Sequence, residues 1–273
     1  MFKAKTKKIE VLATILPNRT ANLEKDVFFG NTNIYIDYAN VKNWYDKLGW
    51  HIDLERLRIF LACFDNIATV NLYHGTLIGD EKSEEEISKI KKCGYTLHTK
   101  PVKIMQHSID ARRINIQDPS ILKSFIRQTL LRRCDLETVE YLNRKFRAMN
   151  QNGELYLEDR KCNFDVEIGR DMLLDFAGNN LDTFVLWSGD SDFYDPLLQL
   201  LKDKKKAVLF ATAGVVSREL NALQNEGLFI FDIQKIKDFI CYNRELGEAA
   251  KESLGKAFMT LPLKRKREPL QAL

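Results

Sequence analysis

Apolar residues in this chain fall into short runs that alternate with amphipathic stretches. The runs predict strands at residues 32–37, 67–73, 95–102, 183–187, 204–211 and 228–233. Helices are predicted between the strands, and Asp53 and Ser217 are suited to cap two of them. Strands that alternate with helices form a mostly parallel sheet with helices on both faces. The expected fold class is therefore a doubly wound α/β domain.

Residues 104–158 break this alternation. Apolar residues recur there at helical spacing over 121–133 and 136–149, so we expect a helical insertion. Residues 112–147 carry nine Lys/Arg against four Asp/Glu. Such a patch suits a polyanion, although a solvated charged face explains it equally well. The insertion is also a candidate surface for a protein partner or a homo-oligomer.

Composition narrows the class of protein. No apolar run approaches the roughly 20 residues of a membrane-spanning helix, and the lysine-rich N-terminus lacks the apolar region of a secretory signal. We therefore expect a cytoplasmic protein with no membrane partner. The five cysteines include no CxxC pair, which argues against a disulfide framework or a zinc-thiolate site. We expect a main domain at 26–245, flanked by a loosely ordered basic extension at 1–25 and a flexible basic tail at 246–273.

Carboxylates gather where predicted strands end. The run 183–187 leads into the turn SGDSD, which carries Asp190 and Asp192, and Asp37 ends the first strand. Asp165 begins a helix that precedes the strand at 183–187. Ends of parallel strands meet at one edge of the sheet, so these acids are expected to converge. An all-oxygen cluster without nearby His or Cys favours Mg²⁺ or Mn²⁺ over zinc.

Each acid also has a purely structural explanation. Asp37 could end a strand, Asp192 could cap a helix, and Asp165 could interact with a helix dipole. Asp171 lies six positions after Asp165, on a different helical face, and is expected to be secondary. It is the joint occurrence of the acids that favours a metal site.

Four motifs together resemble those of a known family. They are YIDYANV, KCNFDVEIGRDML, WSGDSDFYDPLLQLL and SRELNALQNEGLFIFDI, in that order and spanning residues 32–240. They resemble the LabA-like NYN domain family, which is related to PIN domains. The resemblance implies a PIN-like α/β/α fold with a metal-dependent ribonuclease site. The stretch Lys161-Cys162-Asn163-Phe164-Asp165 departs from the shorter Lys-Gly-Val-Asp link that is common in the family.

The resemblance also implies roles for individual residues. The catalytic, metal-binding set would be Asp37, Asp165, Asp190 and Asp192, with Asn40 and Ser188 beside it. Its ligand would be Mg²⁺ or Mn²⁺, and its products would carry a 5′-phosphate and a 3′-hydroxyl. The partner would be RNA, and single-stranded RNA fits a narrow acidic pocket better than a duplex does.

Basic and aromatic residues are the candidates for RNA contact. Phosphate contacts are expected from Lys161, Arg170, Arg127, Arg132, Arg133 and Arg144. Unpaired bases could stack on Tyr38, Trp44 and Tyr45, for which packing in the core is an equal expectation.

Three other functions stay open. An RNA-binding or regulatory NYN module would keep the pocket with little or no turnover. A DNA-directed nuclease could use the same site, because metal-assisted hydrolysis does not require the 2′-OH. A phosphatase of the haloacid dehalogenase type needs a second Asp two residues after its nucleophile, whereas Asp37 is followed by Tyr38 and Ala39.

Overall fold

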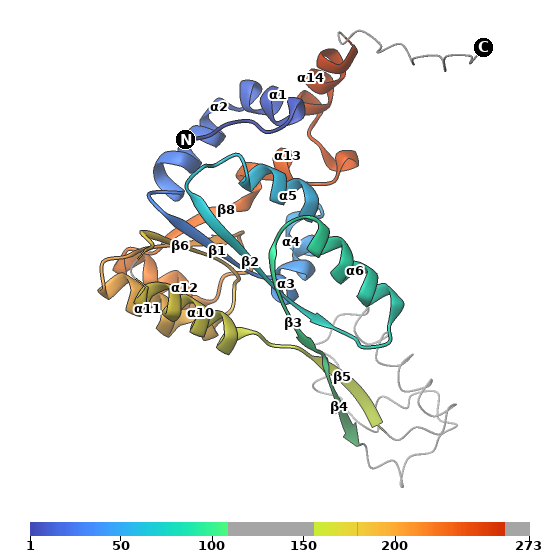
Figure 1. Ribbon diagram of the computed structural model, residues 1–273, viewed down its shortest axis with the longest axis vertical. Helices are drawn as coiled ribbons and strands as arrows, with labels where there is room; N and C mark the ends of the chain where they lie inside the picture. The colour runs from blue at the N-terminus through green and yellow to red at the C-terminus, as the bar shows by residue number, and fades with distance from the viewer. Residues whose placement is uncertain (109–155, 179, 260–273) are drawn as a thin grey trace, which may run out of the picture. The chain divides into compact units, whose positions relative to one another are not determined.

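The computed structural model describes residues 1–108, 156–178 and 180–259. At its centre lies a six-stranded sheet with the order β3-β2-β1-β6-β7-β8, in which every neighbouring pair is parallel (Figure 1). The strands are β1 (Thr32–Asp37), β2 (Ile67–Thr76), β3 (Thr96–Pro101), β6 (Thr183–Trp187), β7 (Lys206–Ala211) and β8 (Phe229–Asp232). All six strands occur where the hydrophobic pattern predicted them. The α/β fold class is confirmed.

The two central strands are buried along their whole length. Every residue of β1 and β6 is buried, and the strands pair in parallel with Ile34 opposite Val185 and Ile36 opposite Trp187. Strands covered on both faces are expected to read as nearly continuous apolar runs, as β6 does. Their pairing brings the carboxyl ends of β1 and β6 side by side.

The direction of winding reverses between these two strands. From β1 the chain proceeds outward to β2 and β3, then returns to β6 and proceeds outward to β7 and β8. Loops that leave neighbouring strands at such a switch point separate to opposite faces of the sheet. The crevice that they leave is the usual ligand site of open α/β sheets.

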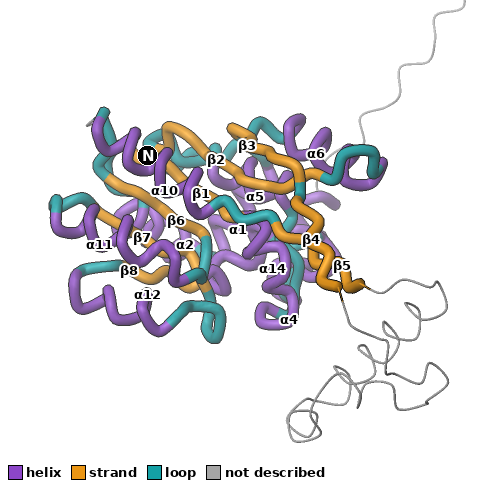
Figure 2. The backbone as a smooth tube through the Cα atoms, turned by 90° about the horizontal axis from the view of Figure 1, so that it is seen from below, coloured by secondary structure: helices purple, strands orange, loops and turns teal. Residues whose placement is uncertain are grey.

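Helices cover both faces of the sheet (Figures 1 and 2). One face carries α5 (Leu54–Leu61), α6 (Glu81–Lys92) and α13 (Lys237–Ile240), and the other carries α10 (Asp165–Ala177), α11 (Tyr194–Lys202) and α12 (Arg218–Ala222). The predicted caps are present, because Asp53 accepts from the backbone N–H of Arg56 and Ser217 accepts from that of Leu220. No helix in the described part of the chain is both long and apolar enough to cross a bilayer.

Shorter helical segments connect the larger elements. They are α3 (Tyr38–Val41), η2 (Lys42–Trp44), α4 (Tyr45–Leu48), η3 (Ser191–Phe193), η4 (Leu223–Glu226), η5 (Ile233–Ile236) and η6 (Asn243–Glu245). Near the N-terminus lie α1 (Lys7–Ile15), α2 (Pro17–Asn22) and η1 (Leu23–Val27), and α14 spans Glu248–Met259.

The two ends of the described chain are more ordered than expected. Helix α1 contacts α14, and their buried side chains include Ile9 and Leu12 of α1 with Ala250 and Leu254 of α14. The expectation of loosely ordered ends is therefore wrong for α1, α2 and α14. These apolar positions lie three or four residues apart among lysines and glutamates, so overall charge concealed an amphipathic pattern. Residues 260–273, with the basic run of the tail, lie outside the described residues.

A second compact unit spans residues 102–162 and includes the predicted insertion. Its described part is an antiparallel ribbon of β4 (Lys103–Ser108) and β5 (Tyr156–Lys161), with Lys103 opposite Lys161. The sequence predicted a helical insertion at about 104–158 and no strand at its two ends, so this ribbon corrects that expectation. Their pairing partners lie about fifty residues apart, so a local pattern could not reveal them. The predicted helices at 121–133 and 136–149 lie outside the described residues.

Candidate metal centre

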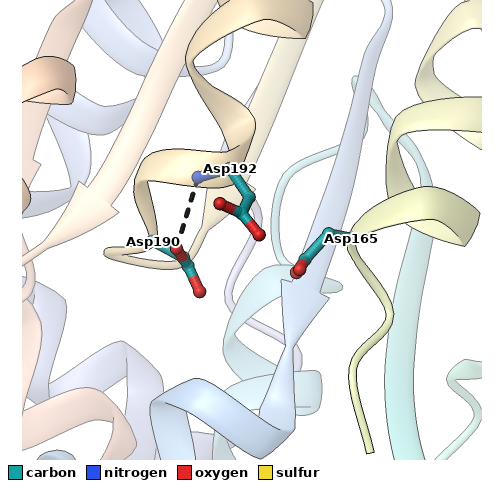
Figure 3. A group of neighbouring side chains, drawn as sticks. All are labelled: Asp165, Asp190 and Asp192. Atoms are coloured by element: carbon teal, nitrogen blue, oxygen red, sulfur yellow. Dashed lines mark hydrogen bonds between the residues drawn. The ribbon is translucent and has the colours of Figure 1, made fainter.

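Three aspartates converge at the carboxyl edge of the sheet (Figure 3). Asp165 is the first residue of α10, and Asp190 and Asp192 belong to the turn that follows β6. One carboxylate oxygen from each lies within 4.8 Å of the others. In Figure 3 their carboxyl groups face a common space between the start of α10 and the turn. The fold thus brings together three of the four acids that the sequence singled out.

The turn that carries Asp190 and Asp192 is held from several sides. Asp190 accepts a hydrogen bond from the backbone N–H of Asp192 at 3.2 Å, and its own N–H donates to Ser188 Oγ at 3.3 Å. Gly189 packs so closely that a Cβ atom there would lie 2.0 Å from the carbonyl oxygen of Val215. Any larger residue at this position would displace the turn. The backbone that carries the two carboxylates is therefore fixed in position.

Asp37 lies behind the three converging acids. It is 5% exposed, and its carboxylate accepts from the backbone N–H of Asn40 at 3.4 Å and from Ser188 Oγ at 3.2 Å. Burial raises the pKa of Asp37, and the negative charge of Asp190 adds to this effect. Ser188 is fully buried and hydrogen-bonds both Asp37 and the turn, so it links the fourth acid to the cluster.

Asn40 supports the same arrangement. Its side-chain oxygen accepts from Trp44 Nε1 at 3.1 Å and from the backbone N–H of Gly189 at 3.3 Å. It therefore ties the segment after β1 to the turn after β6. The structure places both residues that we expected beside the acids, Asn40 and Ser188, in bonds that position the site.

Asp165 lies in an environment that is unfavourable for its charge. Burial is the main cause that raises its pKa to about 6, and the nearby carboxyl groups of Asp192, Asp190 and Asp37 raise it further, while Asn163 lowers it. Its Oδ2 atom is buried without a hydrogen-bond partner. A buried oxygen without a donor is costly, and a cation would compensate it. An all-oxygen set of this kind suits a hard divalent cation such as Mg²⁺ or Mn²⁺.

Asp171 lies in a different environment on the same helix. Its carboxylate accepts from Tyr73 OH at 2.9 Å and from Arg170 Nε and Nη2 at 2.9 and 2.7 Å, and His98 Nδ1 lies 3.8 Å away. Arg170, a predicted RNA contact, is thus engaged in an ion pair within its own helix. Asp171, expected to be secondary, is satisfied by these partners and is not one of the three converging acids.

Other predicted RNA contacts divide between described and undescribed parts of the chain. Lys161 is the last residue of β5 in the second unit. The arginines of the insertion lie outside the described residues; they are Arg127, Arg132, Arg133 and Arg144. Among the aromatic candidates, Tyr38 and Trp44 are buried, whereas Tyr45 is 45% exposed.

Sequence reasoning missed two residues that shape the start and the base of α10. Asn163 Oδ1 accepts from the backbone N–H of Asp165 at 2.9 Å, which fixes the first turn of the helix. Asp175 accepts from Asn33 Nδ2 at 2.8 Å and from the hydroxyl of Tyr35. The only sequence signal was the four-residue spacing of Asp171 and Asp175, which places both on one helical face.

Comparisons with known proteins cover most of the chain. A model of the NYN domain matches residues 115–231, a range that contains Asp165, Asp190 and Asp192 but not Asp37. The low amplitude and bright protein LabA of Synechococcus elongatus is 25% identical over 209 residues, which cover 76% of this chain and 86% of LabA. The crystal structure of a Vibrio parahaemolyticus protein of unknown function aligns with 15% identity and a TM-score of 0.44, over 74% of this chain and 93% of that one. The NYN match over the acidic motifs and the LabA match over three quarters of the chain make this protein similar to LabA and to the NYN domain family, and its parallel sheet with helices on both faces is consistent with a PIN-like α/β/α fold.

Proposed function

We propose that this protein is a Mg²⁺- or Mn²⁺-dependent ribonuclease that hydrolyses phosphodiester bonds at the cluster of Asp165, Asp190 and Asp192. The observation that carries the proposal is the convergence of three carboxylates around a buried Asp165 oxygen that has no hydrogen-bond partner. A cluster that served only as helix caps would leave no such oxygen unsatisfied. Similarity to the nuclease-like NYN domain supports phosphodiester hydrolysis over other metal-assisted reactions.

The three converging acids would hold the metal. Asp37, which is buried next to them, would add further negative charge to the site. Bound there, a divalent cation would stabilise charge on the phosphate and lower the pKa of an attacking water. Ser188 and Asn40 keep Asp37 and the turn in register, so the acids need little reorganisation to act together. The four-acid set inferred from the sequence is retained in this proposal, with Asp37 as its innermost member.

A cleavage assay with matched variants tests the proposal. Full-length protein and a labelled single-stranded RNA are incubated with Mn²⁺, and Asp190→Asn and Asp37→Asn are compared with the wild type. We expect each substitution to lower the rate by roughly 10²-fold or more, because each removes charge from the site that stabilises the transition state. The matched control is Asp195→Asn, an exposed acid in the first turn of α11, which should cleave at the wild-type rate.

Equal cleavage by all four proteins would assign the activity to a contaminating nuclease and contradict the proposal. Parallel assays with single-stranded DNA and p-nitrophenyl phosphate separate the remaining reaction classes. DNA cleavage at the RNA rate would widen the substrate class, and phosphatase turnover that depends on Asp190 would replace the nuclease. Tight RNA binding with no Mn²⁺-dependent cleavage would identify a binding module.

A further inference from the structure

The helical segment after β1 has two faces with different surroundings. Asp37 and Asn40 face the acidic turn, to which Ser188 and Gly189 connect them. The other face consists of Tyr38, Val41, Lys42 and Tyr45, which line a cavity. Their spacing of three and four residues is that of one helical stripe. A single segment therefore forms a wall of the metal centre on one side and a wall of this cavity on the other.

The cavity is small, and half of its lining residues are aromatic. Its volume is about 220 Å³, and its aromatic lining residues are Tyr38, Tyr45, Trp50, His51 and Tyr242. We call this cavity the aromatic pocket. A larger hollow of about 710 Å³, lined in part by residues of α5 and α6, shares Tyr38, Ile52, Glu86 and Tyr242 with it, so the two are adjacent. The sequence indicated Tyr45 alone among these exposed rings, and Tyr242 in particular comes from a distant segment.

The rings at the mouth of the pocket are partly exposed and already stacked. The ring centroids of Tyr45 and His51 lie 4.0 Å apart at an interplanar angle of 23°, and Tyr242 lies 5.6 Å beyond His51. Tyr45 and Tyr242 are 45% and 40% exposed. Glu245 holds His51 in place by accepting from its backbone N–H at 2.9 Å and contacting Nδ1 at 2.7 Å. Flat surfaces held in this way can accept another flat group without rearrangement.

Two basic side chains lie against aromatic rings of the pocket. The ammonium group of Lys42 lies 5.8 Å from the centroid of the Tyr38 ring, and the guanidinium of Arg244 lies 5.4 Å from that of Tyr242. Glu86, the acid in the lining, is compensated by Lys42 at 2.7 Å and by His74 at 3.5 Å. With Lys42 paired to Glu86, Arg244 is the rim cation that can contact a negatively charged group outside the pocket, and the stacked rings favour a flat, uncharged part inside it.

An unpaired nucleobase with its phosphate meets these requirements. Proteins bind single strands by stacking bases on aromatic side chains while basic residues contact the backbone. We infer that the aromatic pocket holds an unpaired base of a single-stranded nucleic acid whose backbone reaches the acidic cluster. This inference rests on the proposed nuclease function and adds a substrate subsite to it. A duplex cannot use the pocket, because its bases are already stacked.

Binding measured without turnover tests the subsite. All proteins carry Asp190→Asn and are kept in EDTA, and fluorescence anisotropy follows a labelled 12-nucleotide single-stranded RNA. We expect Tyr45→Ala and Tyr242→Ala each to weaken binding roughly 5- to 100-fold, the usual range for the loss of a base–aromatic stack. Tyr242→Phe keeps the ring and should bind as tightly as the parent. Phe229→Ala is the matched control, because Phe229 on β8 is 41% exposed but does not line the pocket.

The same probe as a duplex should bind with an affinity that none of these substitutions changes. The inference is overturned if the parent binds no single strand, or if Tyr45→Ala and Tyr242→Ala bind as tightly as Phe229→Ala. Mn²⁺-dependent cleavage by protein with Asp190 intact is measured separately. Cleavage with binding insensitive to Tyr242 would overturn the pocket alone, whereas binding sensitive to Tyr242 without cleavage would overturn the nuclease alone.

Discussion

Helix α10 carries aspartates in two contrasting environments. Asp165 at its first position faces other carboxylates and keeps a buried oxygen without a hydrogen-bond partner. Asp171 and Asp175, further along the helix, have donors for their carboxylates. The same side chain thus serves to anchor the helix at one end and, in our proposal, to bind a metal at the other. The two roles differ in the hydrogen-bond donors that surround each carboxylate, since the residue type is the same.

The anchoring pair attaches α10 to the sheet. Asp171 receives the hydroxyl of Tyr73 from β2, and Asp175 receives the hydroxyl of Tyr35 from β1. Burial, followed by the hydrogen bond to the aspartate, raises the pKa of each tyrosine, so both hydroxyls stay protonated and donate. These bonds fix the position of the helix that carries Asp165. The hydrogen bonds that anchor α10 therefore help to hold Asp165 in its unfavourable environment at the first position of the helix.

The largest effect on stability is expected when the anchor is broken. Asp175→Ala leaves the hydroxyl of fully buried Tyr35 and the amide of Asn33 without their acceptor. The loss of two such bonds should lower the free energy of unfolding by about 2–4 kcal/mol. Urea denaturation of the metal-free protein measures this change in the free energy of unfolding. The prediction fails if Asp175→Ala unfolds at the wild-type urea concentration.

The opposite sign is expected at the start of the helix. Asp165→Asn removes a charge that burial and neighbouring acids disfavour. In metal-free protein at pH 7 we expect a gain of about 1 kcal/mol, a discounted fraction of the roughly 1.4 kcal/mol per pKa unit, since solvent reaches part of the cluster. The increase in Tm that we expect Mn²⁺ to produce in the wild type should shrink or vanish in this variant. Scanning calorimetry with and without Mn²⁺ would contradict this if the variant were less stable and still responded fully to the ion.

The pH dependence sharpens the same contrast. The folded-state pKa of Asp165, about 6, lies above its ordinary value of 3.8, so the folded protein holds this proton longer than the unfolded chain does. The contribution of Asp165 to stability is therefore full below about pH 4 and is lost as pH rises to about 6. The advantage of Asp165→Asn over wild type, measured without metal, should grow across this window. An advantage that is constant from pH 4 to 7 would argue against the raised pKa.

The smallest effect is expected at the exposed partner of the anchor. Arg170 is 60% exposed, so its pair with Asp171 is largely solvated. Arg170→Ala should unfold at a urea concentration close to that of the wild type, because exposed ion pairs contribute little to stability. Tyr73 still donates to Asp171 in this variant. If Arg170→Ala lowered the free energy of unfolding as much as Asp175→Ala in the same urea experiment, the exposed ion pair would stabilise the protein as much as the buried hydrogen bonds do, contrary to this prediction.

Much of the fold could be predicted because its signals are local. Apolar runs marked the strands, and Asp53 and Ser217 marked two helix starts by their capping chemistry. The turn with Asp190 and Asp192 was placed correctly for the same reason. Helices α1 and α14 and the β4–β5 ribbon were missed, since their order depends on partners far away in the chain.

The sequence by itself determined which acids lie at the carboxyl edge of the sheet, because strand periodicity and the order of motifs assign Asp37, Asp190 and Asp192 to strand ends. Only the tertiary structure decided which environment and which hydrogen-bond partners each acid has. Asp37 is buried behind Ser188, Asp165 joins the turn, and Asp171 pairs with Tyr73 instead. Burial and long-range hydrogen bonds set these differences, and neither is visible in the spacing of residues along the chain.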